Sequence, residues 1–196
     1  MYANITIEGV TPLLMNRFPE ENEINISGST SPVLAGDRET PREQAQKKAY
    51  RNKDTGELEF PCQNIMACII EAGKFFTQGK SKLTTQKASL IPAGVAVEGL
   101  TVPFGLDDFE VDSRSVVIPS TRGRAMCHRP RLDKWKLTFS IFIDESLFDP
   151  KFVREIVDRA GKTVGLGDYR PSCKGSFGKF VVKHWEEVAH DKKKAA

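Results

Sequence analysis

Long hydrophobic runs are missing from this sequence. No apolar stretch approaches the roughly 20 residues that a membrane-spanning helix requires. The first residues, MYANITIEG, also lack the basic region followed by an apolar stretch that marks a secretory signal peptide. Cysteine is sparse as well. Four cysteines in 196 residues are too few for a disulfide-stapled secreted domain. We therefore expect reduced thiols, a cytoplasmic protein and no membrane partner.

Patterns typical of metal sites and acid–base catalysis are equally scarce. Five residues separate Cys62 from Cys68, and neither this spacing nor the adjacent pair Cys127 and His128 matches paired zinc ligands. The chain has only three histidines, and no spacing brings two of them together for general acid–base work. We expect no metal, no cofactor and no catalytic residue. The role expected for His128 is a phosphate contact or a stacking group.

Two nucleotide-binding motifs are also absent. After Gly165 and Gly167, a dinucleotide fingerprint needs a third glycine at the position that Arg170 occupies. The segment GKFFTQGKS, residues 73–81, has five residues between its glycines, whereas a phosphate-binding P-loop has four. These differences exclude both motifs.

Net charge is small, but it is unevenly distributed. The chain carries 29 basic and 26 acidic side chains, a formal charge of +3. Residues 114–136 hold seven basic side chains and a single acid, Asp133. Met126, His128 and Trp135 lie among these cations, and this mixture is typical of a platform for single-stranded nucleic acid. The alternative is a solvated, charged loop, but a run of nearly one sign favours nucleic acid.

Hydrophobic periodicity predicts an α+β domain. Ile5 and Ile7 alternate with Asn4 and Thr6, which indicates a strand with one buried face. Strands are expected at 2–8, 90–106, 116–118, 137–143 and 180–182, and helices at 42–50, 63–77 and 149–161. This order predicts a ferredoxin-like (RRM-like) antiparallel sheet with helices on one face. We expect one domain over 1–190, with a flexible insertion at 18–60, a projecting basic hairpin at 114–136 and a charged tail at 191–196.

A glycine-rich stretch, VGLGDYRPSCKGSFGKFVV, is the most specific feature and covers residues 164–182. Glycines allow close backbone approach to a ligand and can expose N–H groups that hold phosphate oxygens. Arg170, Lys174 and Lys179 add positive charge. The alternative is that the glycines only make turns between the last helix and the last strand.

The ending of this loop, G-x-F-G-x followed by a hydrophobic strand, resembles the hallmark of the RAMP superfamily, the RRM-like proteins of CRISPR systems. The opening strand, residues 5–13, is similar to a first strand of that superfamily. The sequence Phe60-Pro61-Cys62-Gln63-Asn64-Ile65 leads into a helix in a similar way. The helix then departs from the usual pattern, because Ala67, Cys68 and Glu71 occur where Lys-Gly and Arg positions are typical.

The resemblance implies a repeated backbone subunit that binds guide RNA and contacts copies of itself and other subunits of the complex. It also implies that Met126 presses into the bound strand. Two alternatives stay open: a guide-RNA-processing endoribonuclease with His128 as its candidate residue, and a phage or mobile-element protein that binds single-stranded DNA or serves a structural assembly. The candidate nucleic-acid-binding residues are Arg17, Arg114, Arg122, Arg124, Met126, His128, Arg129, Arg131, Lys134, Gly165, Gly167, Arg170, Lys174, Gly175 and Lys179.

Overall fold

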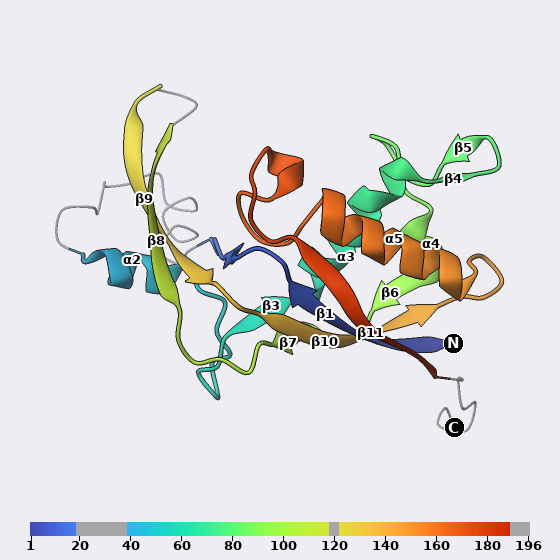
Figure 1. Ribbon diagram of the computed structural model, residues 1–196, viewed down its shortest axis with the longest axis horizontal. Coiled ribbons are helices and arrows are strands. Elements are labelled where there is room, and N and C mark those ends of the chain that lie inside the picture. Colours follow the sequence, from blue (N-terminus) through green and yellow to red (C-terminus); the bar gives the residue numbers. More distant parts are fainter. Residues whose placement is uncertain (19–38, 118–121, 189–196) are drawn as a thin grey trace, which may run out of the picture.

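The main sheet of this α+β protein is antiparallel and lies beneath two helices (Figure 1). The structure, a computed structural model, describes residues 1–18, 39–117 and 122–188. The strand order is β11–β1–β10–β6, and every neighbouring pair is antiparallel. The strands of this sheet are β1 (Tyr2–Gly9), β6 (Val95–Val97), β10 (Lys136–Ile143) and β11 (Phe180–Val188).

Alternating side chains divide the sheet into a buried and an open face. In β1, Ala3, Ile5 and Ile7 are fully buried, whereas Asn4 and Thr6 on the other face are half-buried. Each fully buried Ile or Leu side chain stabilises the fold by roughly 1.5–3 kcal/mol relative to an exposed one. Buried and open side chains alternate in β10 in step with those of its neighbour β1. These two central strands therefore supply most of the apolar side chains on which the helices pack.

The helices α3 (Cys62–Ala72) and α5 (Pro150–Thr163) cover the buried face of the sheet. The carboxylate of Asp149 caps α5, because its Oδ1 accepts a hydrogen bond of 2.8 Å from the amide of Lys151. Ile65 and Ile69 of α3 are buried in the same core cluster as Val153 and Ile156 of α5. The helices therefore fix the position of the loop that follows α5.

A long hairpin projects from this core (Figure 1). It consists of β8 (Glu110–Val117) and β9 (Arg124–Leu132), and β2 (Leu13–Leu14) pairs with the inner end of β9. Helix α2 (Pro41–Lys47) packs beside the hairpin and begins with a capping box between Thr40 and Glu43. The hydrogen bonds of this box are the main cause that lowers the pKa of the Glu43 carboxyl.

Part of the segment expected as an insertion contributes to the core. Residues 19–38 lie outside the described residues, but Leu58 and Phe60 are fully buried. The segment ends in β3, which pairs with β7 of the connection between β6 and the hairpin. The bounds are Glu59–Pro61 for β3 and Thr101–Pro103 for β7. Residues 189–196, which contain the expected charged tail, are also outside the described part.

The remaining elements are short. They are η1 (Gly73–Phe75), β4 (Thr77–Gln78), β5 (Ser81–Lys82), α4 (Ile91–Gly94) and η2 (Pro171–Cys173). Strands β4 and β5 form a small hairpin near the C-terminal end of α3. Within the described ranges, no helix has the length and apolar character needed to cross a membrane.

Candidate nucleic-acid interface

The outer end of the β8–β9 hairpin carries exposed cations and exposed apolar side chains. Arg124 lies opposite Val117 in the strand register, and Met126 lies opposite Ser115. The side chains of Met126 and Val117 are 58% and 56% exposed. Arg122 and Arg124 form no ion pair with any residue that the structure describes. Two uncompensated guanidinium groups therefore lie next to apolar surface, as a site for phosphates and unstacked bases requires.

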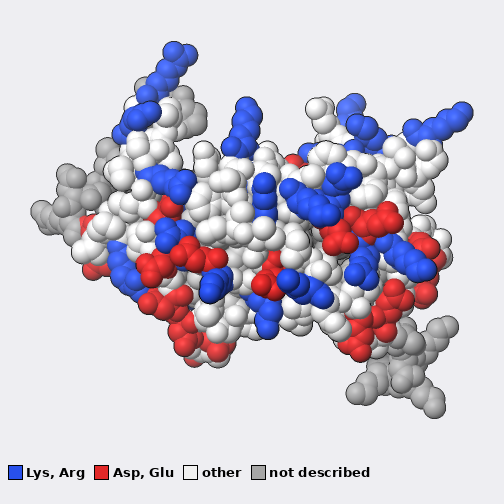
Figure 2. Space-filling model, viewed as in Figure 1, with Lys and Arg blue, Asp and Glu red and all other residues white. Residues whose placement is uncertain are grey.

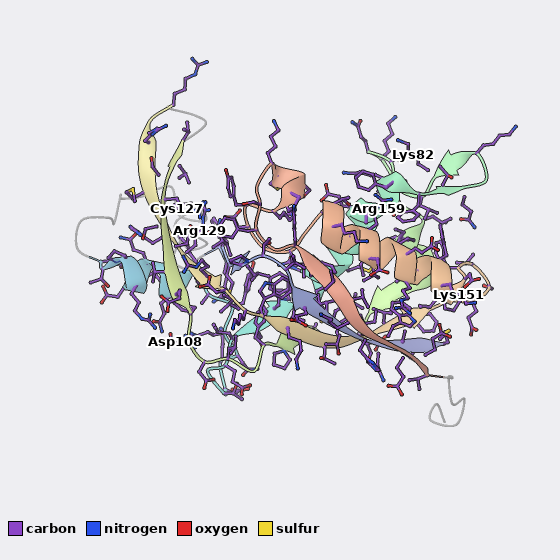
Figure 3. The ribbon with its side chains drawn as sticks, viewed as in Figure 1. Lys82, Asp108, Cys127, Arg129, Lys151 and Arg159 are labelled. Carbon is purple, nitrogen blue, oxygen red and sulfur yellow. The ribbon has the colours of Figure 1, made fainter. Side chains whose placement is uncertain are left out.

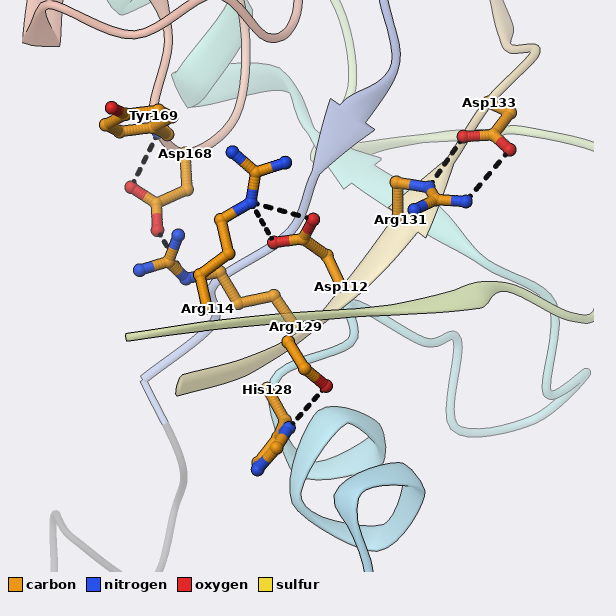
Figure 4. Close-up of polar contacts among 9 residues, drawn as sticks. Asp112, Arg114, His128, Arg129, Arg131, Asp133, Asp168 and Tyr169 are labelled. Atoms are coloured by element: carbon orange, nitrogen blue, oxygen red, sulfur yellow. Dashed lines mark hydrogen bonds and ion pairs between the residues drawn. The ribbon is translucent and has the colours of Figure 1, made fainter. Parts of the chain in front are cut away.

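The inner part of the hairpin uses its arginines to hold the glycine-rich loop (Figure 4). The Nε of Arg114 lies 2.9 Å from each carboxylate oxygen of Asp112. The guanidinium carbon of Arg114 lies 4.6 Å from the ring centroid of Phe177 in the loop. The Nε of Arg129 lies 3.1 Å from Oδ2 of Asp168, in an ion pair rather than a directed hydrogen bond.

The burial of Arg129 corrects its assignment as a nucleic-acid contact. Its side chain is only 10% exposed, and its charge is already compensated by Asp168. A ligand phosphate would have to displace that carboxylate from a partly dry site. Arg129 is therefore a structural cation that joins the hairpin to the loop. Arg114 shares its charge with Asp112 but keeps a partly exposed side chain.

Asp168→Ala is expected to lower the free energy of unfolding by about 1–2 kcal/mol, because it leaves Arg129 buried without its counterion. The expected loss is modest because the Asp168 side chain is itself 30% exposed, so water weakens its attraction to Arg129. Asp133→Ala is the matched control, because it removes a carboxylate from an exposed pair with Arg131 and is expected to cost less than about 0.5 kcal/mol. Urea titrations of both variants measure the difference, and equal losses would contradict the structural role of Arg129.

The base of the hairpin is less suited to phosphate. Arg131 donates hydrogen bonds of 2.7 and 3.2 Å to the two oxygens of Asp133, and these bonds are the main cause that raises the pKa of Arg131. Lys134 lines a shallow depression of about 220 Å³ together with Asp108, Glu110 and Asp133. Neighbouring carboxylates repel an anion at short range. Arg131 and Lys134 are therefore less available to a phosphate than the exposed cations at the hairpin tip.

The histidines do not form a paired site in the described part of the chain. Nδ1 of His128 lies 2.7 Å from the hydroxyl of Ser113 across the hairpin. His184 lies 3.7 Å from a carboxylate oxygen of Glu186 on β11. His190 falls outside the described residues. Within those residues, there is also no cluster of His, Cys, Asp and Glu side chains that would hold a metal ion.

The glycine-rich loop folds back on itself and on the segment between β1 and β2. The amides of Gly165, Gly175 and Gly178 donate to the carbonyls of Ala160, Arg170 and Pro12, at 2.9, 2.9 and 2.7 Å. These three N–H groups are therefore not free to hold phosphate oxygens, which corrects that expectation. These amides can reach backbone carbonyls because glycine has no side chain, so the backbone segments approach more closely than a Cβ would allow.

The cations of the loop differ in how far they are neutralised. Lys174 is exposed, and neither it nor the ammonium group of Lys179 forms an ion pair with a described residue. Arg170 donates a bond of 3.1 Å to the carbonyl of Gly167 and lies 4.0 Å from a carboxylate oxygen of Glu71. Arg17 lies beside α2, where its amide donates to the carbonyl of Lys48.

Basic side chains gather on one edge of the molecule. Figure 2 shows Lys and Arg side chains projecting from the edge where the β8–β9 hairpin, η2 and the β4–β5 hairpin end, whereas Asp and Glu lie in the middle and lower parts of this face, mixed with further Lys and Arg side chains. The β4–β5 hairpin and α5 add Lys80, Lys82 and Arg159 to this basic edge, and the last two are labelled in Figure 3. Sequence reasoning missed these residues. The available signal was the absence of any acid from 72 to 97, a range that contains four lysines.

A cavity of about 260 Å³ lies beside the glycine-rich loop. Side chains of α3, the segment after β2, and the segment before β3 complete its walls. Sequence reasoning missed Asn16, Tyr50 and Asn64 because nothing in their spacing indicates that the fold brings them together. The buried thiol of Cys68 also lines this cavity, and burial raises its pKa to about 12. Cys68 is therefore a neutral wall residue at physiological pH.

Comparisons with known proteins give a likeness at the level of the fold. No family model and no curated protein matches the chain. Among solved structures, it is similar to a chain of the "Cryo-EM structure of the Type III-B Cmr-beta bound to cognate target RNA", with a TM-score of 0.55 and 11% sequence identity. The similarity covers 94% of this chain and 59% of that chain. The present chain therefore shares the fold of a part of a longer protein.

Proposed function

We propose that this protein is a non-catalytic subunit of a CRISPR-type ribonucleoprotein complex that binds single-stranded RNA through its basic edge. We also propose that its core is ferredoxin-like (RRM-like) and belongs to the RAMP superfamily. The strand order β11–β1–β10–β6 supports this core, because α3 and α5 form connections that cross one face of the sheet. The fold shared with a chain of an RNA-bound Cmr structure agrees with it.

The outer end of the β8–β9 hairpin is the observation that carries the proposal. Arg122 and Arg124 lack counterions among the described residues, and Met126 offers exposed apolar surface two residues further along β9. Cations that neutralise phosphates release condensed counterions, while apolar side chains contact the faces of unstacked bases. Lys174, which follows η2, and Lys179, which precedes β11, add two cations of the glycine-rich loop that have no ion-pair partner among the described residues.

The proposed ligand is guide RNA, and the proposed assembly is a row of copies along that strand, joined to other subunits. A head-to-tail contact that does not close into a ring produces such a helical row. The projection of Lys and Arg side chains from one edge fits a subunit that holds the strand along that edge. The glycine-rich loop supports the site by anchoring the hairpin, and the amides of Gly165, Gly175 and Gly178 are used within the fold.

Fluorescence anisotropy with labelled RNA and DNA of identical sequence tests this function. We expect RNA to bind more tightly, with an affinity that falls steeply as salt increases. A preference for DNA would support the mobile-element alternative. An affinity that does not change with salt would contradict binding of phosphates by the exposed cations. A hairpin repeat RNA is incubated with wild type and with His128→Ala in parallel. Cleavage that only the wild type performs would replace the proposed binding role with that of a processing ribonuclease.

A further inference from the structure

We infer that the cavity beside the glycine-rich loop receives one unstacked nucleobase of the bound strand. This inference rests on the proposed function, because it assigns a subsite to the same RNA. The cavity, of about 260 Å³, is slightly smaller than typical small-molecule sites, so it suits one base rather than a length of strand. It is bounded by the loop that also holds the basic hairpin.

Three polar side chains at the cavity have donors and acceptors that are available to a ligand. The side-chain amides of Asn16 and Asn64 and the hydroxyl of Tyr50 form no hydrogen bond with any described residue. An amide presents both a donor and an acceptor, as the edge of every nucleobase does. Two amides and a hydroxyl around one cavity therefore match the hydrogen-bonding edge of a base.

The apolar part of the lining suits the faces of a base. Half-buried Tyr50 and exposed Ala67 of α3 are the lining residues that offer apolar surface to a ligand. The ring of Tyr50 rests edge to face on the buried ring of Phe60, with centroids 6.1 Å apart. RNA-binding proteins hold splayed bases through this combination of aromatic surface and polar groups.

The charges around the cavity favour a base over a phosphate. Arg170 is the cation of the lining, but it already donates to the carbonyl of Gly167 and lies 4.0 Å from Glu71. Asp168 also lines the cavity, but its charge is paired with Arg129, so the lining offers no uncompensated cation to a phosphate. A neutral base needs no such cation and can donate one of its N–H groups to a carboxylate.

The strand is the source of the base because the cavity and the exposed Lys174 belong to the same loop. Lys174 lies in the turn that follows the cavity-lining residue Arg170. A phosphate held by Lys174 would keep the neighbouring bases close to the loop that lines the cavity. Unstacking a base from a single strand costs far less than extracting it from a duplex, so binding can offset this cost.

Asn64→Ala, assayed with two ligands, tests the inference. The first ligand is an octamer of uridine, and the second is an octamer of tetrahydrofuran-phosphate spacers, which has phosphates but no bases. We expect Asn64→Ala to weaken binding of the RNA octamer about fivefold or more and to leave binding of the spacer octamer unchanged. Gln63→Ala is the matched control, because Gln63 is exposed and lines a different depression, beside Val97.

Each other outcome overturns the inference. Equal weakening with both ligands would make Asn64 a phosphate contact, and no weakening with either would leave the cavity without a role in binding. Tyr50→Phe removes only a hydroxyl and repeats the test if Asn64→Ala unfolds. Failure of the wild type to bind either octamer would contradict the proposed function itself, which separates the two failures.

Discussion

Charge reversal at the hairpin tip, Arg122→Glu with Arg124→Glu, is expected to weaken RNA binding about a hundredfold at low salt. Both guanidinium groups lack a counterion among the described residues, so each is available for a phosphate. Losing about two phosphate contacts also reduces the slope of log affinity against log salt by about 1.4 for a single strand. Anisotropy titrations over a series of salt concentrations measure both quantities. The loss should be similar for RNAs of different sequence, because phosphates carry no sequence information.

The matched control is Lys136→Glu with Lys151→Glu, which changes the net charge by the same amount. Lys136 is an exposed residue at the start of β10, and Lys151 lies at the first turn of α5, far from the hairpin in Figure 3. At about 0.15 M salt we expect binding to stay within about threefold of wild type, since exposed charges more than about 8 Å from the strand are then largely screened. Equal losses in the two double variants would mean that net charge, rather than the hairpin, holds the strand.

Elements with a strong local pattern were predictable from the sequence. Alternation in β1 and β10 and the apolar spacing of α5 are properties of short segments, and these elements occur where they were expected. Strand β8 was expected only at 116–118 but begins at Glu110. Its earlier residues, such as Ser113 and Arg114, are polar and pair with β9 in a hairpin that projects from the core. Hydrophobic periodicity therefore gives no signal for them.

The candidate site was predictable as a charge cluster but not in its detailed roles. Composition alone identified Arg122 and Arg124, which the structure leaves without described counterions. It could not separate them from Arg129, because the carboxylate of Asp168 is distant in sequence and reaches Arg129 only through the folded loop. Contacts between distant segments also decide the role of the glycine amides and the position of Asn64 in the cavity.

The glycine-rich loop should be sensitive to a single added methyl group, and Gly178→Ala is expected to lower the free energy of unfolding by about 3 kcal/mol. Gly178 has a φ of +69°, a conformation that L-residues adopt at a cost of about 1–2 kcal/mol. A Cβ at this position would also lie well inside 3.0 Å of the carbonyl oxygen of Leu166, so the backbone must shift. That shift disturbs the bond of 2.9 Å from the amide of Leu166 to the carbonyl of Gly178.

Gly56→Ala separates the two causes. Gly56 has a similar φ of +76°, but a Cβ there would meet no atom within 4 Å. Both substitutions restrict the unfolded chain equally, so this contribution cancels between them. We expect Gly56→Ala to cost about 1 kcal/mol, and the remaining loss in Gly178→Ala to measure the crowding inside the loop. Urea titrations give both values. Equal small losses would mean that the loop rearranges freely, and a loop of that kind would not anchor the hairpin through Asp168 and Phe177.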